Sequence, residues 1–177
     1  MTIIINSEVL SELINSEQLK IVKKRQQHSD NFNYYFSPSI GLNLWKPKVM
    51  IINPKFIVLE FNKIEHMSLL ILLRDINKKL QKLVKNKNSE LFNTDIYNIM
   101  SEIDNDKFTI RCYLPNFKGK HLIKCYVDKN EEMFKLPRVN TVIDNCIIEI
   151  RNIWKTNDKS GFNIELKSTS YFFKSNE

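Results

Sequence analysis

Residues Val142–Phe173 read VIDNCIIEIRNIWKTNDKSGFNIELKSTSYFF, and this stretch decides the fold class. Two runs of alternating apolar and polar residues flank a polar turn that contains one glycine. A period of two residues is typical of a strand with one buried face, and two such runs around a turn predict a long β-hairpin. We therefore expect an antiparallel sheet that packs on one face and binds a partner on the other.

The two faces of this hairpin differ in composition. The apolar face is expected to hold Val142, Cys146, Ile148, Ile150 and Trp154 in the first strand, and Phe162, Ile164, Leu166 and Phe172 in the second. The opposite face holds Glu149, Arg151 and Lys155, followed by Asn163, Glu165, Lys167, Thr169 and Tyr171. The register of Trp154 predicts that this ring is buried, so that its loss would harm the fold more than binding.

Upstream of the hairpin, helical and strand patterns alternate. Apolar residues at helical spacing predict helices over 7–28, with Ser7 as its cap, and over 64–85, and a third, short helix over 90–103. Strands are expected over 33–36, 41–45, 48–52, 55–61, 107–114 and 121–127, the last two as a hairpin, with a tight turn at Asn53–Pro54. The pattern predicts a single α+β domain over 1–177 with a mostly antiparallel sheet and additional helices at 7–28 and 64–85.

The charge of the chain favours an anionic partner. It carries 27 Lys and Arg against 20 Asp and Glu, a formal net charge of +7, with the excess in residues 1–88. Such a balance is typical of proteins that bind nucleic acid or an acidic surface. Alanine is absent and Gly occurs three times, which indicates an AT-rich genome and reduces the weight of the lysine count.

Several classes of site find no support in the sequence. His28, His66 and His121 have no metal-ligand spacing, Asp104 and Asp106 lack a third carboxylate in register, and no glycine-rich phosphate loop occurs. We therefore expect no catalytic residue, no metal and no cofactor. A nucleotide-processing enzyme is kept as an alternative function, beside the binding and interaction functions described below.

The cysteines and the apolar runs bear on location. Cys112, Cys125 and Cys146 are isolated, and we expect buried free thiols in a reducing compartment. The N-terminus has no signal-peptide pattern, and the most apolar run, Met67–Leu73, is far shorter than a membrane span. An intracellular protein with no membrane partner is expected.

Nucleic-acid binding needs cations for phosphates and flat side chains on which bases stack. We predict phosphate contacts from Lys107, Arg111, Lys118, Lys120, Lys124, Arg151, Lys155 and Lys167, and base stacking on Tyr113, Phe117, Tyr126 or Tyr171. Arg111, Tyr113, Lys124 and Tyr126 are expected on one continuous surface of the 107–127 hairpin.

Two other basic groups have simpler interpretations. The lysines in the second half of the 64–85 helix suit a solvated helix face. Lys20, Lys23, Lys24 and Arg25 suit the C-terminus of the 7–28 helix, where they would complement its dipole, although they could also contact phosphates.

The segment IRNIWKTNDKSGFNIELKSTSYF resembles the closing hairpin of the OB-fold single-stranded-DNA-binding proteins encoded by large nucleocytoplasmic DNA viruses. The matching residues are Ile150, Ile153, Trp154, Gly161, Ile164, Leu166 and Lys167. The resemblance implies an OB-like core over 31–173, with a helical insertion at about 64–103 and an N-terminal appendage over 1–30. It also implies sequence-tolerant binding of single-stranded DNA, in preference to other nucleic acids, in viral replication or repair in the host cytoplasm or nucleus.

The helices exceed what a minimal five-stranded OB barrel needs. They are insertions, a homo-oligomerisation element, or the sign of another α+β fold. The alternative function is a virion-associated or structural interaction protein, whose helices pack against a partner and whose basic surface is incidental.

Overall fold

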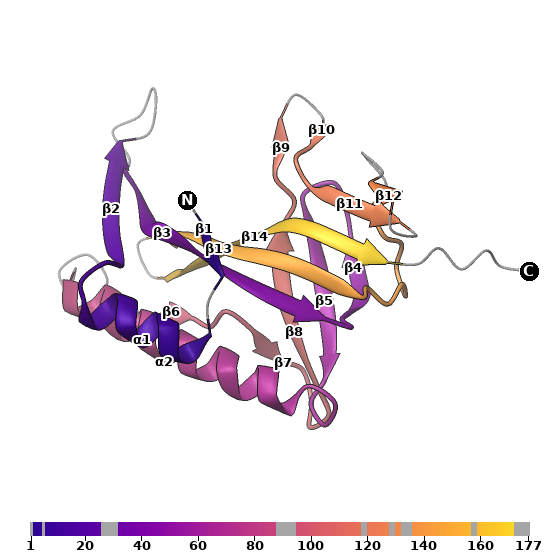
Figure 1. Ribbon diagram of the computed structural model, residues 1–177, viewed down its shortest axis with the longest axis horizontal. Coiled ribbons are helices and arrows are strands. Elements are labelled where there is room, and N and C mark those ends of the chain that lie inside the picture. Colours follow the sequence, from indigo (N-terminus) through magenta and orange to yellow (C-terminus); the bar gives the residue numbers. More distant parts are fainter. Residues whose placement is uncertain are drawn as a thin grey trace, which may run out of the picture. The chain divides into compact units, whose positions relative to one another are not determined.

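The computed structural model describes residues 2–4, 6–25, 32–87, 95–117, 120–127, 130–131, 136–156 and 159–171. Over these residues, two helices and a mixed set of strands form an α+β fold, which confirms the predicted class (Figure 1). The chain divides into two compact units. The first unit consists of Met1–Gly41, Met67–Ile99 and Ile150–Asn163, and the second of Leu42–His66, Met100–Glu149 and Ile164–Glu177.

Each unit combines complete helices or strands with parts of three long strands that are divided between the two units. The first unit holds β1 (Thr2–Ile4), α1 (Ser7–Asn15), β2 (Lys20–Arg25), most of β3 (Phe32–Trp45), α2 (Met67–Lys87) and β6 (Ile96–Tyr97), with the end of β13 (Asn145–Lys155) and the start of β14 (Ser160–Tyr171). The second unit holds β4 (Lys48–Ile52), β5 (Phe56–Asn62), β7 (Ser101–Glu102), β8 (Lys107–Tyr113), β9 (Asn116–Phe117), β10 (Lys120–His121), β11 (Lys124–Val127) and β12 (Asn130–Glu131), with the remainder of β3, β13 and β14.

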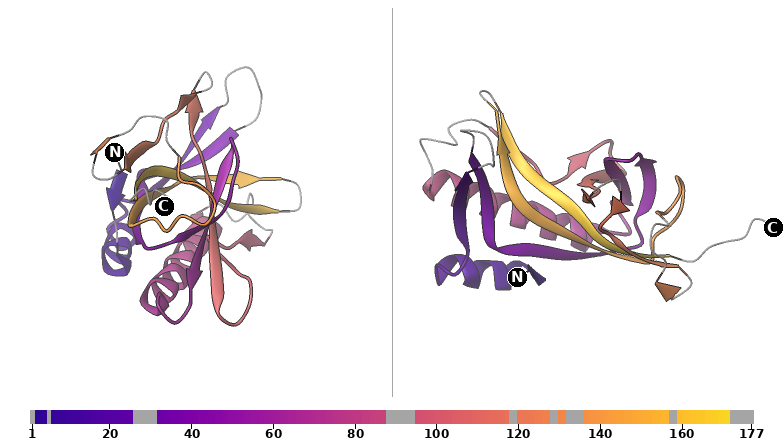
Figure 2. Two further views of the ribbon diagram at one scale, coloured as in Figure 1. Left: turned by 90° about the vertical axis from the view of Figure 1, so that its right-hand side faces the viewer. Right: turned by 90° about the horizontal axis from the view of Figure 1, so that it is seen from above.

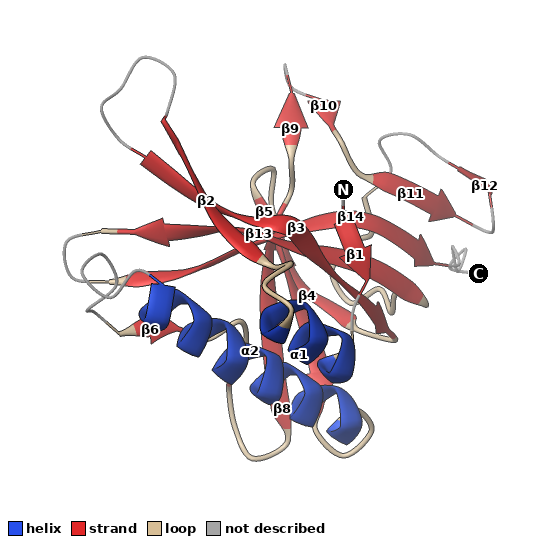
Figure 3. Cartoon of the chain, turned by 60° about the vertical axis from the view of Figure 1, so that its left-hand side comes forward, coloured by secondary structure: helices blue, strands red, loops and turns tan. Residues whose placement is uncertain are grey.

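In the first unit, two helices lie side by side (Figure 3). The apolar stripe of α2 is buried over its whole length: Leu69, Leu70, Leu73, Ile76, Leu80, Leu83 and Val84. This helix confirms the one predicted over 64–85, and Leu10 and Leu13 give α1 its buried face. Such amphipathic helices gain most of their stability from this packing rather than from intrinsic propensity.

The helix predicted over 7–28 is wrong beyond Asn15. Asn6, rather than Ser7, caps it, because its Oδ1 accepts from the backbone N–H of Val9 at 2.9 Å. After α1, Glu17 has a left-handed φ of 56°, and the chain turns into β2. There Lys20–Arg25 pairs antiparallel with Phe32–Ser37 of β3 (Figure 2). The run KIVKKR contains two β-branched residues, which favour a strand once a partner strand is available.

The third helix predicted over 90–103 is also wrong over its described residues, which form β6 and β7. Side chains of α2 hold residues 96–99 of the first unit in place of helical hydrogen bonds. Asn77 accepts from the N–H of Ile99 at 3.0 Å, and Gln81 donates to the carbonyl of Ile96 at 2.8 Å. These two amides satisfy backbone groups that an isolated helix would have paired internally.

In the second unit, β5 lies between β4 and β8 and is antiparallel to both (Figure 1). Its burial alternates strictly, and Phe61 stacks on Phe108 of β8 with ring centroids 4.9 Å apart. The predicted turn at Asn53–Pro54 is present, and Asn53 Oδ1 accepts from the N–H groups of Lys55 and Phe56. Phe108, Ile110, Cys112 and Leu114 are all buried, as their alternation predicted.

The hairpin predicted between 107–114 and 121–127 is wrong. The two strands pair with β14 rather than with each other: Glu165 pairs with Tyr113 of β8, and Ser168–Tyr171 pairs with Lys124–Val127 of β11, both in parallel. Parallel strands cannot be joined by a tight turn. Within the connection, Lys120 pairs with Phe117 and His121 with Asn116, which makes β9 and β10 a small ribbon.

The predicted terminal hairpin is present. At its turn, in the first unit, the N–H of Thr156 donates a hydrogen bond to the carbonyl of Lys159 at 2.8 Å. Its predicted faces hold only in part. Cys146, Ile148, Ile150, Phe162, Ile164 and Leu166 are buried as expected. Thr169 and Tyr171 are buried as well, so the alternation slips by one residue between Lys167 and Ser168, as it does at a bulge. Val142, expected in the core, is 54% exposed.

The three cysteines are free and buried, as predicted. Burial raises the pKa of the Cys146 thiol to about 12. Burial, and then the charge of the neighbouring Cys146, raises the pKa of Cys112 well above its ordinary value. Apolar surroundings therefore keep both thiols protonated and unreactive in the folded protein.

Substitution of Phe108 by alanine is expected to lower the free energy of unfolding by about 3–5 kcal/mol, since it removes a large ring from the packed core. Urea denaturation measures this change. Leu122→Ala, at an exposed position of the same unit, is the control and is expected to change it by about 0.5 kcal/mol or less. Equal effects of the two substitutions would contradict the core assigned to β5 and β8.

The raised thiol pKa predicts a loss of stability in alkali. The unfolded Cys146 loses its proton from pH 9.0 upward and the folded one only near pH 12, so between these values the unfolded state binds fewer protons. The free energy of unfolding then falls as the pH rises. Denaturation at several pH values should show a smaller fall in Cys146→Val than in the natural protein. The same pH dependence of the free energy of unfolding in both proteins would contradict a raised pKa of the buried Cys146 thiol.

Candidate nucleic-acid interface

An aromatic and basic patch occupies the outer face of β5 and β8 in the second unit. Tyr113 is 41% exposed and pairs across the strands with Phe56, while the next outward residue of β8 is Arg111. The Arg111 guanidinium carbon lies 3.9 Å from the centroid of the Phe56 ring and 5.8 Å from that of Tyr113. A planar guanidinium against one ring keeps its charge while its position is restricted. We call Phe56, Arg111 and Tyr113 the β5–β8 patch.

The sequence interpretation missed Phe56. Residues 55–61 were expected to form a strand, but nothing in the sequence said which residue of β8 would lie across from this ring. The register decides it, because Phe56 pairs with Tyr113 and Val58 with Arg111. The alternation of β5, with Ile57 and Leu59 buried, could have placed Phe56 on the outer face.

Lys107, at the other end of β8, is held by an acidic partner. Its Nζ lies 3.2 Å from Glu60 Oε1 on β5, and the Lys63 ammonium lies 2.8 Å from Glu102 on β7. Thr109, between Lys107 and Arg111, is buried. A phosphate contact at Lys107 would therefore compete with its ion pair to Glu60. On the outer face of β8, Arg111 is the exposed cation.

Lys167 on β14 forms ion pairs with two carboxylates. Its Nζ contacts Glu149, which is buried, and Glu165 at 3.1 Å. Partial burial lowers the pKa of Lys167, but the hydrogen bonds and charges of Glu149 and Glu165 outweigh it and raise the pKa above its ordinary value. This lysine neutralises a buried carboxylate, which is a structural task rather than the predicted phosphate contact.

The four residues predicted to share one surface lie on two strands that both pair with β14 rather than with each other. Arg111 and Tyr113 are exposed on β8, whereas Lys124 is exposed and Tyr126 half-buried on β11. Cys112 and Cys125, their neighbours in the chain, are buried, so all four side chains point away from the buried side of their strands. The surface predicted as one hairpin therefore includes the ion-paired Lys167 and Glu165 of β14.

Two predicted contacts change at the ends of these strands. Tyr171, proposed as a stacking ring, is 4% exposed, because the slip in alternation turns it toward the core. Lys120 is exposed on β10. Lys118 and the side chain of Phe117 lie outside the described residues, so their roles stay predictions.

The first unit carries its own cations and rings. Arg151 and Lys155 are exposed on β13. Trp154, expected in the core, is half-buried and stacks on Tyr97, with ring centroids 5.9 Å apart. The side chain of Ile153, next to Trp154 in the chain, is buried instead.

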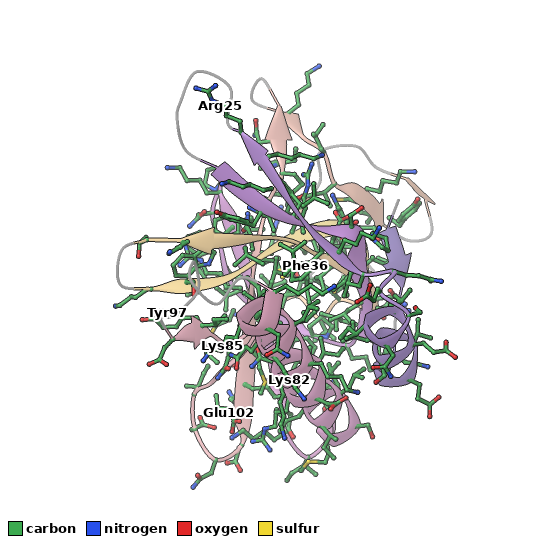
Figure 4. All side chains as sticks on the ribbon, turned by 90° about the vertical axis from the view of Figure 1, so that its left-hand side faces the viewer. Arg25, Phe36, Lys82, Lys85, Tyr97 and Glu102 are labelled. Atoms are coloured by element: carbon green, nitrogen blue, oxygen red, sulfur yellow. The ribbon has the colours of Figure 1, made fainter. Side chains whose placement is uncertain are left out.

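The basic run of 20–25 lies on a strand and not at a helix end. Lys20, Lys24 and Arg25 are exposed on β2, and the Lys24 ammonium lies 5.5 Å from the centroid of the Tyr35 ring on β3. Figure 4 shows Arg25 at the end of β2. The helix dipole therefore does not explain these cations, and their interpretation as phosphate contacts gains weight.

Metal-binding groups and membrane-spanning helices are two further features that bear on function. Within the described part of the chain, no group of three or more His, Cys, Asp and Glu side chains is placed to hold a metal ion. Neither helix in this part is long and apolar enough to cross a membrane.

No protein-family model matches the chain, and no curated protein matches it significantly. Among solved structures, the C-terminally truncated single-stranded DNA-binding protein of bacteriophage Enc34 matches with a TM-score of 0.52 and 11% identity, over 91% of this chain and 98% of that one. The Enc34 protein in complex with single-stranded DNA matches with a TM-score of 0.50 and 11% identity, over 89% and 97%. At this identity the likeness concerns the fold, and it confirms the predicted OB-like α+β class.

The assignment of Lys167 predicts a loss of stability when this side chain is removed. Lys167→Ala leaves the buried carboxylate of Glu149 with one cationic partner fewer, and the free energy of unfolding is expected to fall by about 1–3 kcal/mol, since partial exposure screens the pair. Lys124→Ala, an exposed lysine on β11, is the matched control and should leave it nearly unchanged. Unaltered stability of Lys167→Ala would return Lys167 to the phosphate-binding candidates.

Proposed function

We propose that this chain is a sequence-tolerant single-stranded-DNA-binding protein that acts in viral DNA replication or repair. The observation that carries the proposal is the β5–β8 patch, where a guanidinium lies against Phe56 beside an exposed tyrosine. Rings of this kind stack with any base, and cations beside them contact phosphates without reading sequence. The likeness to the Enc34 protein, which binds single-stranded DNA, supports the same function.

Each unit supplies its own set of proposed contacts. Phosphates are expected to meet Arg111, Lys120 and Lys124 in the second unit and Arg151 and Lys155 in the first, which all lie on the surface. Bases are expected to stack on Tyr113, with Tyr126 contributing its exposed edge. Phe117, the last residue of β9, and Lys118, which follows it in the sequence, complete the predicted set.

The proposal also covers origin and context. The solved relatives come from a bacteriophage, while the terminal segment resembles proteins of large nucleocytoplasmic DNA viruses, and we propose a viral protein of the second kind. It would act inside the infected cell where viral DNA is copied, as a binding protein rather than an enzyme. We propose that it prefers single-stranded DNA to other nucleic acids. We also propose that it associates with itself through the helices.

A second candidate function is a structural or virion-associated interaction protein. Exposed apolar side chains around β4 favour it, namely Trp45, Met50, Ile51 and Val142. The bridge between Lys48 and Val142 brings two of these segments together. Such a surface would bind a protein through apolar area, and its affinity would depend little on salt.

Fluorescence anisotropy with single-stranded DNA, double-stranded DNA and RNA of matched length tests the proposal. We expect the tightest binding to single-stranded DNA, similar affinities for different sequences, and a log–log salt slope of about −0.7 for each contacted phosphate. Absence of binding to single-stranded DNA at about 50 mM salt would refute the function. Salt-independent binding would favour the interaction protein.

The β5–β8 patch predicts a graded series of variants. Arg111→Ala removes a charge and a planar group, so both the affinity and the salt slope should fall. Arg111→Lys keeps the charge and loses the planar group, so the slope should stay while the affinity falls. Tyr113→Leu should weaken binding by about 1–3 kcal/mol with the slope unchanged.

Lys78→Ala, an exposed position on α2, is the control for charge in this series. Wild-type affinity in both Arg111→Ala and Tyr113→Leu would exclude the patch from the interface. Thermal unfolding of each variant separates a change in binding from a change in folding.

A further inference from the structure

Three neighbouring strands of the first unit place two aromatic rings and a glycine together. Gly161 at the start of β14 pairs with Tyr97 of β6. On the other side of Gly161, the hairpin bond between Thr156 and Lys159 places Trp154 of β13 across from it. Trp154, Gly161 and Tyr97 thus lie on adjacent strands, and the two rings stack at 5.9 Å with 27° between their planes.

The glycine is required by the position of the indole. A Cβ atom built on Gly161 would lie 2.7 Å, 2.8 Å and 2.9 Å from three atoms of the Trp154 ring, closer than van der Waals contact permits. The indole therefore lies directly over the backbone of β14. A ring held in this way has one side against the strand and keeps a restricted orientation.

The rings are not sealed into the core. Tyr97 is 51% exposed and Trp154 is half-buried, whereas Ile96 and Ile153, their neighbours in the chain, are buried. A pair that only closed the end of the hairpin would gain most by full burial, since apolar area removed from water is the main source of stability. Tyr97 therefore stays accessible from solvent.

Cations lie next to these rings. The Lys159 ammonium is 5.7 Å from the centroid of the Tyr97 ring. The side chain of Gln81 bonds the carbonyl of Ile96, which places this part of α2 beside β6, and Lys85 follows one helical turn later and is exposed. Figure 4 shows Lys85 on α2 and Tyr97 on β6. Part of the lysine-rich half of α2 thus lies beside the two rings.

We propose that Trp154 and Tyr97 form a base-stacking subsite for single-stranded DNA, with Lys159 and Lys85 contacting the flanking phosphates. The inference rests on the proposed function and adds a subsite in the first unit, apart from the β5–β8 patch. Stacking on an indole is tolerant of sequence, because every base presents a flat face. Gly161 is a positioning residue, which holds the indole flat without touching the DNA.

Tryptophan fluorescence tests the subsite directly. The chain has two tryptophans, so Trp45→Phe leaves Trp154 as the sole indole. Titration of this variant with an oligothymidylate of about 15 nucleotides should quench its emission as anisotropy reports binding. In the same background, Tyr97→Leu should weaken binding roughly 5- to 100-fold. Gly161→Ala should also weaken it, although both rings are still present.

The controls separate the subsite from folding and from the proposed function. Ile71→Ala, at an exposed apolar position of α2, should bind like the parent, and both Ile71→Ala and Tyr97→Leu should keep the parent's melting temperature. Tyr97 is at the surface, so its variant tests the proposal even where Gly161→Ala fails to fold. Wild-type binding with unquenched Trp154 and full affinity in Tyr97→Leu would overturn the subsite alone. Absence of any binding to single-stranded DNA would overturn the proposed function as well.

Discussion

The parallel pairing of β14 is the constraint on which the second unit depends. Residues Ser168–Tyr171 pair with β11, and Glu165 pairs with Tyr113 of β8, so two segments that lie close in sequence pair with the same strand and in the same direction. Because β8 and β11 are not hairpin partners, the residues between them are free to form the β9–β10 ribbon. On the β13 side of β14, Lys167 forms an ion pair with the buried Glu149.

Cations in this protein have two kinds of partner, and the kind of partner separates structure from binding. Lys107 and Lys167 have carboxylates within ion-pair distance, which neutralise their charge. Arg111 and Lys159 lie over aromatic rings, which attract a cation without cancelling it. A net charge of +7 therefore says less about binding than the partner of each cation does.

Each unit carries its own combination of rings and cations, and the two are built differently. In the second unit a guanidinium packs on Phe56, and cross-strand register supplies the neighbouring tyrosine. In the first unit a glycine lets an indole lie flat over the backbone beside Tyr97. Both combinations suit a ligand of repeating bases and phosphates, because rings stack on bases and cations contact phosphates.

Local periodicity alone determined much of this protein: the α+β class, helix α2, strands β4, β5 and β8 with their buried faces, the terminal hairpin and the free buried thiols. These features repeat every two or every 3.6 residues, so the chain itself records them. The pattern also put Arg111 and Tyr113 on an outer face, because their neighbours are strongly apolar.

Only the tertiary structure decided which strand lies beside which. It placed β2 against β3, so that KIVKKR became a strand rather than the end of a helix. It paired both β8 and β11 with β14, slipped the alternation so that Tyr171 was buried, and brought Tyr97, from a segment predicted to be helical, to Trp154. Pairing between distant segments is set by the packing and hydrogen bonds of the whole sheet, and the period of a single segment contains no record of its partner.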